Sequence, residues 1–332
     1  MFKRLLLIAV IVITFVGLTY QFMHVSKQAP LPTNIELRAA MDIGSGSTGM
    51  KVVQYDLAKH KVVKLVFDEQ RRVPYMRHLE ISKDNRFDSE IMQMGMGAIK
   101  EFKQIADDLG VKKVVAVATA AFRKAANGEE FANEIKKETG VDFYIIDQVK
   151  EGELGFQGAA MKAGLDQQSA LSSIVWDIGG GSMQLTTQKE DGSFIVGRGE
   201  FASDPFKLYI IGTLQKKDVV AVHSPNPISE AQKEEGLKKV MEVASQVDPV
   251  IVGKLKDGQV KVLAVGDLFY YGIRGINHGN AVVTQADLEK EIALMIGKSD
   301  EDLGGTFADV RVSNAILILG YMKQLEIKQV EI

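Results

Sequence analysis

The sequence predicts an α/β protein built from two related halves, and three observations lead to this prediction. Two near-copies of one glycine-rich loop, Asp42–Thr48 and Asp177–Gln184, lie about 135 residues apart. Each loop follows a short apolar run with the character of a strand, Leu37–Met41 and Ile174–Trp176. The length of 332 residues favours two domains over one compact core.

Each loop has a composition that suits phosphate binding. An Asp at the end of a strand, followed by Gly and Ser, is typical of a loop whose backbone N–H groups surround phosphate oxygens. Glycine allows close approach of the backbone and positive φ, and Asp42 and Asp177 can hold a divalent metal, directly or through water. One such loop alone fits an ordinary β-turn equally well. Two of them, at the heads of two halves, predict a nucleotide or phosphate clamped between the halves. The candidate phosphate contacts are Gly44, Ser45, Gly46, Ser47, Gly179, Gly180, Gly181 and Ser182.

The composition is that of a globular protein without a global affinity for nucleic acid. Hydrophobic residues make up 46% of the chain and charged residues 25%. The formal net charge of -3 provides no basic field for a nucleic-acid backbone. A polyanionic substrate therefore requires local positive charge or metal. The chain has no cysteine, which excludes disulfides and thiolate metal sites.

The N-terminus carries a targeting pattern. Lys3 and Arg4 precede an apolar stretch, Leu5–Val16, that continues more weakly to Met23. This pattern predicts an export signal, and its length of roughly 19 residues just spans a bilayer. An uncleaved anchor, a cleaved signal peptide and a buried N-terminal helix remain alternatives. Because positive charge stays inside, the globular part is expected outside the cytoplasm. Ser26–Thr33 has the composition of a linker.

Beyond the linker, strand and helix patterns alternate. The spacing of apolar residues predicts a helix over Ser89–Leu109, and Asn127 is a plausible N-cap for a helix over Gly128–Glu138. Asp191-Gly192 predicts a hairpin turn in the second half. The expected strands are Met50–Tyr55, Val62–Asp68, Lys113–Ala118, Phe143–Ile146, Leu185–Thr187, Phe194–Gly197 and Val260–Val265, and further helices are expected near Ser229–Gln246 and Val312–Leu325.

Two segments between the loops carry candidate chemistry. Ala118–Arg123 leaves a strand and enters a helix, where Thr119 and Arg123 can contact a phosphate or serve only as a cap and a surface charge. Lys150–Gly158 follows a strand, where an active-site loop lies in an open α/β sheet. Hydrolysis of a phosphoanhydride needs a group that orients or deprotonates water, and Glu151 or Glu153 can do this. The alternative is a solvated helix start, where acidic residues suit the helix dipole.

The motifs taken together resemble the Ppx/GppA phosphatases, which are exopolyphosphatases and guanosine pentaphosphate phosphohydrolases. The resemblance runs from about Ala39 to the C-terminus and is densest from Ala118 to Gln184. The two glycine-rich loops match the two phosphate loops of that family. The stretch from Arg123 to Ile146 follows the family pattern in order and spacing, and Val265-Gly266-Asp267 occupies the place of a third glycine motif.

The resemblance implies a fold, a domain division and roles for individual residues. The implied fold is the duplicated actin/hexokinase-like (ribonuclease H-like) fold, with two domains around a phosphate-binding cleft. The expected division is an N-terminal signal anchor and linker (1–34), a first actin-like domain (35–147) and a second (148–332). The alignment of Leu154, Phe156 and Gly158 places the catalytic glutamate at Glu151. Arg123 and the loop residues are expected to bind phosphate, and Asp42 and Asp177 to hold Mg²⁺.

Gln184 departs from the family pattern, which usually has an acidic residue at this position. The turn near Gly199–Ala202 also differs from the Arg-Met-Gly-like sequence usual there. Apyrase-type nucleoside tri- and diphosphatases share the fold and resemble this chain at Ala118–Arg123, at Glu151–Gly155 and at Asp177–Gln184, where glutamine is their expected residue. In that reading Gln184 positions the attacking water.

We therefore expect a phosphoanhydride hydrolase that releases terminal phosphate from polyphosphate or guanosine pentaphosphate. An exported apyrase-like nucleotidase and a non-catalytic phosphate-ligand sensor are the alternatives. The expected partners are the phosphate-polymer or nucleotide substrate and, through the N-terminal segment, the membrane; a homodimer is possible and nucleic acid is not expected. The expected location is the inner membrane, with the globular part outside the cytoplasm, or the periplasm.

Overall fold

The chain divides into two compact units that meet between Asp147 and Gln148, and each is described here by itself. The structure is a computed structural model, and it describes residues 31–332. The expected signal anchor, Leu5–Val16 with its weaker extension, lies outside the described residues. Within 31–332, no helix combines the length and the apolar character that crossing a bilayer requires.

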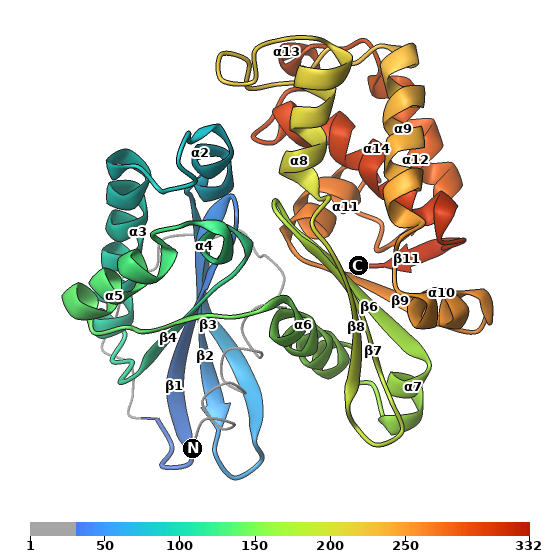
Figure 1. Cartoon of the computed structure of the whole chain (residues 1–332). Helices are drawn as coiled ribbons and strands as arrows, with labels where there is room; N and C mark the ends of the chain where they lie inside the picture. Colours follow the sequence, from blue (N-terminus) through green and yellow to red (C-terminus); the bar gives the residue numbers. More distant parts are fainter. Residues whose placement is uncertain (1–30) are drawn as a thin grey trace. The chain divides into compact units, whose positions relative to one another are not determined.

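The first unit is one five-stranded sheet with helices, in the order β3-β2-β1-β4-β5 (Figure 1). Strands β1, β2 and β3 form an antiparallel meander, whereas β4 and β5 continue from β1 in parallel. The elements are β1 (Ile35–Ile43), β2 (Ser47–Asp56), β3 (Lys61–Arg72), α2 (Tyr75–Ile81), α3 (Ser89–Asp108), β4 (Val114–Ala118), α4 (Ala120–Lys124), α5 (Gly128–Thr139) and β5 (Asp142–Ile145).

The core of the first unit is aromatic where α4 meets the long helices. Phe122 stacks on Phe131 with ring centroids 5.6 Å apart and also contacts Tyr75 and Phe87 edge-on. The predicted helix α3 forms because its apolar residues recur on one face, and the Asp88 carboxylate caps it by accepting from the Ile91 N–H at 2.9 Å. This packing holds α4 against the end of β4, where the predicted phosphate contacts of this unit begin.

The second unit is a six-stranded sheet in the order β10-β11-β9-β6-β7-β8. Strands β6, β7 and β8 are an antiparallel meander, and β9 and β11 run parallel to β6. The elements are α6 (Gln148–Ala163), α7 (Gln167–Leu171), β6 (Ser173–Ile178), β7 (Met183–Gln188), β8 (Phe194–Gly199), α8 (Ser203–Leu208), the π-helix η1 (Tyr209–Leu214), α9 (Glu230–Ala244), α10 (Pro249–Lys256), β9 (Lys261–Val265), the π-helix η2 (Leu268–Ile273), α11 (Arg274–Ile276), β10 (Val282–Thr284), α12 (Gln285–Met295), α13 (Asp300–Leu303), α14 (Ala308–Gln324) and β11 (Gln329–Glu331).

The two sheets have the same topology. A three-stranded antiparallel meander is followed by two parallel strands in each, and β10 is an addition at the edge of the second sheet. This repetition confirms the duplicated α/β fold predicted from the two loops, whose actin-like form the resemblance implied. The core of the second unit centres on α14, whose residues from Val312 to Met322 are all buried. Trp176 on β6 packs edge-on against Phe269 and Tyr321, with centroids 5.1 and 5.9 Å apart. Figure 1 shows α9, α12 and α14 gathered on one side of this sheet.

The predicted strands and long helices are present, but two local predictions are wrong. The segment Lys150–Gly158 was expected to be a loop and lies instead within the helix α6, because its glycines serve close packing and do not break the helix. Asn127 precedes α5 without capping it. Its buried amide accepts from the Phe87 N–H at 2.8 Å and donates to the Phe87 carbonyl at 3.0 Å. The Asn127 side chain therefore bonds to a residue distant in sequence and does not cap α5 as the local sequence predicted.

Candidate functional site

The first glycine-rich loop is a four-residue turn at the carboxyl end of β1. Ile43 pairs with Thr48 across the turn, and Asp42 pairs with Gly49. The Gly44 N–H donates to the Ser47 carbonyl at 2.9 Å and closes the turn. Asp42, one residue before the end of β1, is half-buried. Its carboxylate therefore lies at the sheet edge from which the loop departs.

The second loop repeats this geometry at the carboxyl end of β6. Ile178 pairs with Met183, Asp177 pairs with Gln184, and the Gly179 N–H donates to the Ser182 carbonyl at 3.0 Å. The turn has four residues in both units, and the Asp occupies the same place relative to it. The near-identity of the two sequences therefore corresponds to near-identity of backbone structure.

In each loop, carbonyl groups are bonded to the protein while at least one central N–H group is not. The carbonyls of Ser45 and Gly46 accept from the N–H groups of Met76 and Val73, at 2.9 and 3.0 Å. In the second loop the Gly180 carbonyl accepts from the Asp204 N–H at 2.8 Å. Within residues 31–332, the N–H groups of Ser45, Gly46 and Gly180 have no hydrogen-bond acceptor. A loop with bonded carbonyls and unbonded N–H groups suits an anion.

The loop glycines leave the backbone open to close approach and do not adopt an unusual backbone conformation. None of the loop glycines has positive φ, so that part of the expectation is wrong. At Gly46 and at Gly179 an added Cβ would meet no protein atom within 4 Å. The space over both glycines is therefore open.

Asp177 lies in contact with two further glycines of the second unit. A Cβ at Gly266, which has a φ of 94°, would lie 2.9 Å from Asp177 Oδ1, and a Cβ at Gly155 would lie 3.7 Å from Oδ2. Gly266 follows β9, which pairs with β6 so that Asp177 stands beside Val265. The third glycine motif of the sequence therefore provides room for the Asp177 carboxylate.

Glu151 lies on the face of α6 that approaches Asp177. Gly155 is one helical turn after Glu151, so the two residues share a helix face, and Gly155 is the residue that faces Asp177 Oδ2. Glu151 itself is half-buried. Gly152 brings the helix close to the sheet, because a Cβ there would meet Thr186 Oγ1 and Val196 Cγ1, each at 2.6 Å.

Glu153, the competing candidate, is engaged differently. Its carboxylate pairs with Lys150 Nζ at 3.0 Å along the helix, at (i, i+3) spacing. It lies two positions after Glu151 and therefore on a different side of α6. The structure separates the two carboxylates that the sequence left as alternatives.

Gln184 is buried opposite Asp177, and its row on the sheet contains a residue that sequence reasoning missed. Only 1% of Gln184 is exposed, and its amide donates to Ser182 Oγ at 3.4 Å. The register of β6, β7 and β8 aligns Asp177, Gln184 and Arg198 across three strands, so their side chains emerge on one face. Arg198 is exposed, and no ion pair or hydrogen bond engages its side chain within the described chain. The sequence predicted the hairpin that carries Arg198, but only the strand register shows that Arg198 lies in one row with Asp177 and Gln184.

In the first unit, Thr119 and Arg123 lie next to β1 and β5. The Thr119 N–H donates to the Ile43 carbonyl at 3.2 Å, which attaches α4 beside the first loop. Arg123 is half-buried and donates from Nη1 to the Ile146 carbonyl at 2.9 Å. Part of the guanidinium therefore fixes the chain directly after β5.

The donor set suits a metal held partly by substrate. No group of three or more His, Cys, Asp or Glu residues between 31 and 332 forms a metal cage. Mg²⁺ in phosphoryl-transfer sites commonly takes one or two carboxylates together with substrate phosphates and water. The Asp177 carboxylate stands between Gly266 and Gly155, so neither of these two positions places a side chain against its oxygens. Asp42 has the equivalent place in the first unit.

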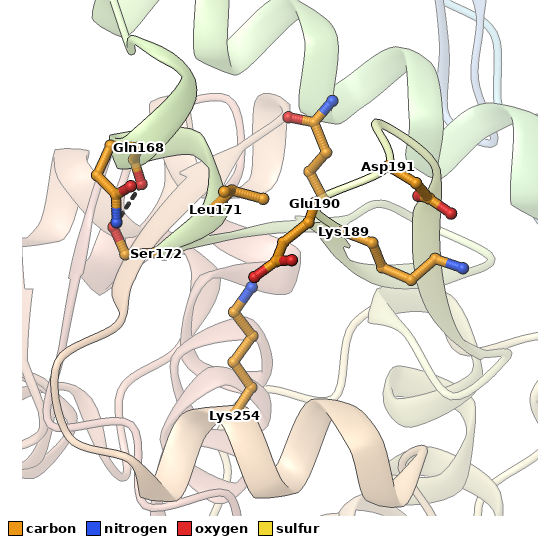
Figure 2. Close-up of a pocket in the computed structure, with 8 residues that line it drawn as sticks. Gln168, Leu171, Ser172, Lys189, Glu190, Asp191 and Lys254 are labelled. Atoms are coloured by element: carbon orange, nitrogen blue, oxygen red, sulfur yellow. Dashed lines mark hydrogen bonds between the residues drawn. The ribbon is translucent and has the colours of Figure 1, made fainter.

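A separate pocket lies at the opposite end of the β6 and β7 strands (Figure 2). Its volume is about 660 Å³, and Lys254 reaches it from α10. Lys254 donates a hydrogen bond to Thr187 Oγ1, and burial lowers the pKa of its amine. The other lining residues are Gln168, Leu171, Ser172, Gln188, Lys189, Glu190 and Asp191. None of the predicted site residues lines this pocket.

Comparison with known structures agrees with this architecture. The crystal structure of the Ppx/GppA family member of Aquifex aeolicus is 19% identical, with 90% of this chain and 93% of that chain covered and a TM-score of 0.66. An exopolyphosphatase of Cytophaga hutchinsonii is 17% identical, with 89% and 94% covered and a TM-score of 0.67. At these identities the likeness establishes the fold.

The sequence itself establishes the family. The profile of the Ppx/GppA phosphatase family matches residues 52–247, which is more than half of the chain. The enzymes of this family are generally metal-dependent phosphatases. The matched segment includes the second loop, Glu151 and Arg123, and the first loop precedes it. The chain therefore belongs to the Ppx/GppA phosphatase family and is a hydrolase that acts on phosphoanhydrides.

Proposed function

We propose that the protein releases the terminal phosphate of polyphosphate or guanosine pentaphosphate by attack of a water that Glu151 orients and deprotonates, with Mg²⁺ bound. The observation that carries the proposal is the position of Gly155 against Asp177 Oδ2, one helical turn after Glu151. A carboxylate on that face of α6 is suited to act on a water beside a phosphate held at the second loop.

The loops supply the binding and the charge stabilisation. In the second loop the unbonded N–H group of Gly180 and the hydroxyl of Ser182 suit phosphate oxygens, and in the first loop the unbonded N–H groups of Ser45 and Gly46 and the hydroxyls of Ser45 and Ser47 have the same character. Asp177 would hold Mg²⁺, which neutralises phosphate charge when bound, and Asp42 has the equivalent position for a metal in the first unit. Most of the rate then comes from position and electrostatics, because phosphoryl transfer requires little covalent chemistry from the protein.

A matched pair of substitutions tests the role of Glu151. Glu151→Gln is isosteric and removes the base, so phosphate release should fall by about 10²–10⁴-fold while substrate affinity changes little. Glu153→Gln is the control, since it removes the half-buried ion pair with Lys150. Phosphate release is measured with polyphosphate, guanosine pentaphosphate, ATP and ADP in the presence of Mg²⁺. A larger loss in Glu153→Gln would show that the other carboxylate is the base.

The environment of Gln184 favours a second candidate, an apyrase-like nucleotidase. Gln184 is buried beside Asp177 and bonded to Ser182, a position from which an amide orients water without adding charge. Under this candidate Gln184→Glu places a third carboxylate near Glu151 and raises its pKa, so phosphate release should fall and the pH optimum should rise. A gain of activity at lower Mg²⁺ concentration would instead support the acidic residue usual in the family.

We further propose that the globular part functions outside the cytoplasm, either anchored by Leu5–Val16 or after cleavage. The charges of Lys3 and Arg4 before an apolar segment support this. Alkaline phosphatase fused after Pro32 should be active outside the cytoplasm. An inactive fusion, with the protein in the soluble cytosolic fraction, would refute export.

A further inference from the structure

The turn between β2 and β3 forms an exposed, cationic end of the first sheet. The segment from Leu57 to Lys64 contains three lysines and one histidine and no acidic residue. None of the three lysines forms an ion pair with another residue between 31 and 332. The exposed residues of this segment, which we call the hairpin tip, are Leu57, Lys59, His60, Lys61, Val63 and Lys64. The hairpin tip therefore presents positive charge to solvent.

The local backbone directs the apolar side chains of the hairpin tip outwards. Asp56 ends β2 and is buried, and its carboxylate accepts from the N–H groups of Ala58 and Lys59, each at 2.9 Å. This acidic group therefore serves the turn and not the surface. Val63 is the extra residue at an irregularity in the β2–β3 register and is 52% exposed, and Leu57 is 39% exposed. Neither belongs to the buried core of the first unit.

Lysines interleaved with exposed aliphatic side chains suit the surface of an anionic bilayer. A lysine near such a surface is attracted by the phosphate headgroups. Its aliphatic stem can lie along apolar surroundings while the ammonium stays in water, and neighbouring aliphatic side chains gain by entering the boundary between headgroups and acyl chains. The hairpin tip combines both contributions, because Leu57 and Val63 flank its lysines.

The chain enters the first unit beside the hairpin tip. Ile35, the first residue of β1, pairs with Asp56, and the Leu57 N–H donates to the Asn34 carbonyl at 2.8 Å. Figure 1 shows the start of β1 and the β2–β3 turn at the same end of the sheet. The apolar pattern of the proposed anchor ends at Met23 in the sequence, and the residues from there to Asn34 span at most about 40 Å. A bilayer that holds the anchor is therefore within this distance of the hairpin tip.

The first glycine-rich loop lies at the opposite end of the same two strands. Asp42 pairs with Gly49 beside that loop, whereas Ile35 pairs with Asp56 beside the hairpin tip. The intervening part of β1 measures roughly 25 Å. Contact between the hairpin tip and a bilayer therefore leaves the loop on the side of the first unit that faces away from the membrane.

We propose that the hairpin tip rests on the anionic surface of a bilayer and turns the glycine-rich loop of the first unit away from it. The inference relies on one part of the proposed function, the membrane anchor at Leu5–Val16. It adds a second, electrostatic contact, whose partner is a surface of phospholipids with negatively charged headgroups.

The test uses single cysteines in the full chain, which has no cysteine of its own. Val63→Cys carries an environment-sensitive fluorophore, and the protein is combined with vesicles of phosphatidylcholine or of equal parts phosphatidylcholine and phosphatidylglycerol. With phosphatidylglycerol the emission should shift to the blue and be quenched by nitroxide-labelled lipid, because the contact needs anionic headgroups. Met94→Cys is the matched control, since Met94 is 41% exposed on α3 of the same unit and outside the hairpin tip.

A charge-neutral variant tests the role of the lysines. Lys59→Gln, Lys61→Gln and Lys64→Gln are combined with Val63→Cys. Each lysine near an anionic surface contributes about fivefold to the equilibrium constant, so the equilibrium constant for contact of the label with lipid should fall roughly hundredfold. Added salt should weaken the wild-type contact in the same direction, because it screens exposed charges. Phosphate release should stay at the wild-type rate.

A label at Val63→Cys that remains in water with phosphatidylglycerol vesicles would refute the contact. A blue shift without quenching by nitroxide-labelled lipid would show a second copy of the chain or another protein on the hairpin tip, and would also refute it. Flotation of the same samples separates the contact from the anchor. If the charge-neutral variant floats with both vesicles but loses label contact, anchor and contact are both supported. If flotation requires both the lysines and phosphatidylglycerol, the contact is supported and the anchor fails; if the wild type floats with neither vesicle, both fail.

Discussion

Gly152→Ala should impair catalysis more than stability, because Gly152 sets the distance between α6 and the sheet. An alanine Cβ would meet Thr186 Oγ1 and Val196 Cγ1 at 2.6 Å, whereas ordinary contact begins at 3.4 Å, so the helix and these two side chains must separate by roughly 0.8 Å. Overpacking of this kind costs about 1–3 kcal/mol, and alanine returns about 1 kcal/mol of helix propensity. The net loss of stability is therefore at most about 2 kcal/mol.

The share of this separation that the helix takes up displaces the preceding residue, Glu151. A misplacement of about 1 Å at a catalytic group costs up to about 10²-fold in rate, so we expect kcat to fall ten- to hundredfold while the thermal midpoint falls by only a few degrees. The assays are phosphate release and thermal unfolding. Gly253→Ala is the control, since Gly253 lies in α10 of the same unit with no atom within 4 Å of the added Cβ. Wild-type kcat with a raised midpoint in Gly152→Ala would refute the reasoning.

Four further outcomes follow from the structure. Gly179→Ala meets no protein atom within 4 Å, so it should leave the thermal midpoint unchanged and weaken phosphate binding in calorimetry; unchanged affinity would contradict a phosphate over this glycine. Gly95→Ala would place a Cβ 2.4 Å from the Tyr75 hydroxyl and should destabilise the first unit by about 1–3 kcal/mol in denaturant unfolding, whereas Gly97→Ala, with open space around it, should stabilise α3 by up to about 1 kcal/mol. Trp176 is the sole tryptophan and is fully buried in the second unit, so its fluorescence emission should report the unfolding of that unit. A fluorescence transition whose midpoint shifted only in Gly95→Ala, a change in the first unit, would contradict this. Hydrogen bonds from the Thr284 side chain and N–H hold the pKa of Asp287 below its usual range. The stabilisation that the Asp287 carboxylate gives is therefore complete above about pH 4 and is lost as the pH falls through the lower pKa of the folded state. Asp287→Asn should make the thermal midpoint less dependent on pH below about 4, and an unchanged dependence would count against this cap.

The sequence by itself determined the repeated architecture and the family. Two copies of a strand, an Asp and a glycine-rich turn predicted a duplicated α/β fold, because such a pattern has a local cause: short-range turn chemistry and alternating apolar runs. The same locality allowed the prediction of α3, α9 and the hairpin at Gly192. The resemblance of the motifs then indicated the Ppx/GppA phosphatases, and the family match over residues 52–247 confirms it.

Only the tertiary structure decided which neighbours these residues have. Gly152, Gly155 and Gly266 have different reasons to be glycine, namely sheet contact, the approach of Asp177 and positive φ, and no local pattern distinguishes them. Asn127 has the composition of a cap and bonds instead to Phe87, 40 residues away in sequence. The row of Asp177, Gln184 and Arg198 depends on strand register. Contacts between residues distant in the chain arise from the packing of whole elements, and for this reason the sequence alone does not specify them.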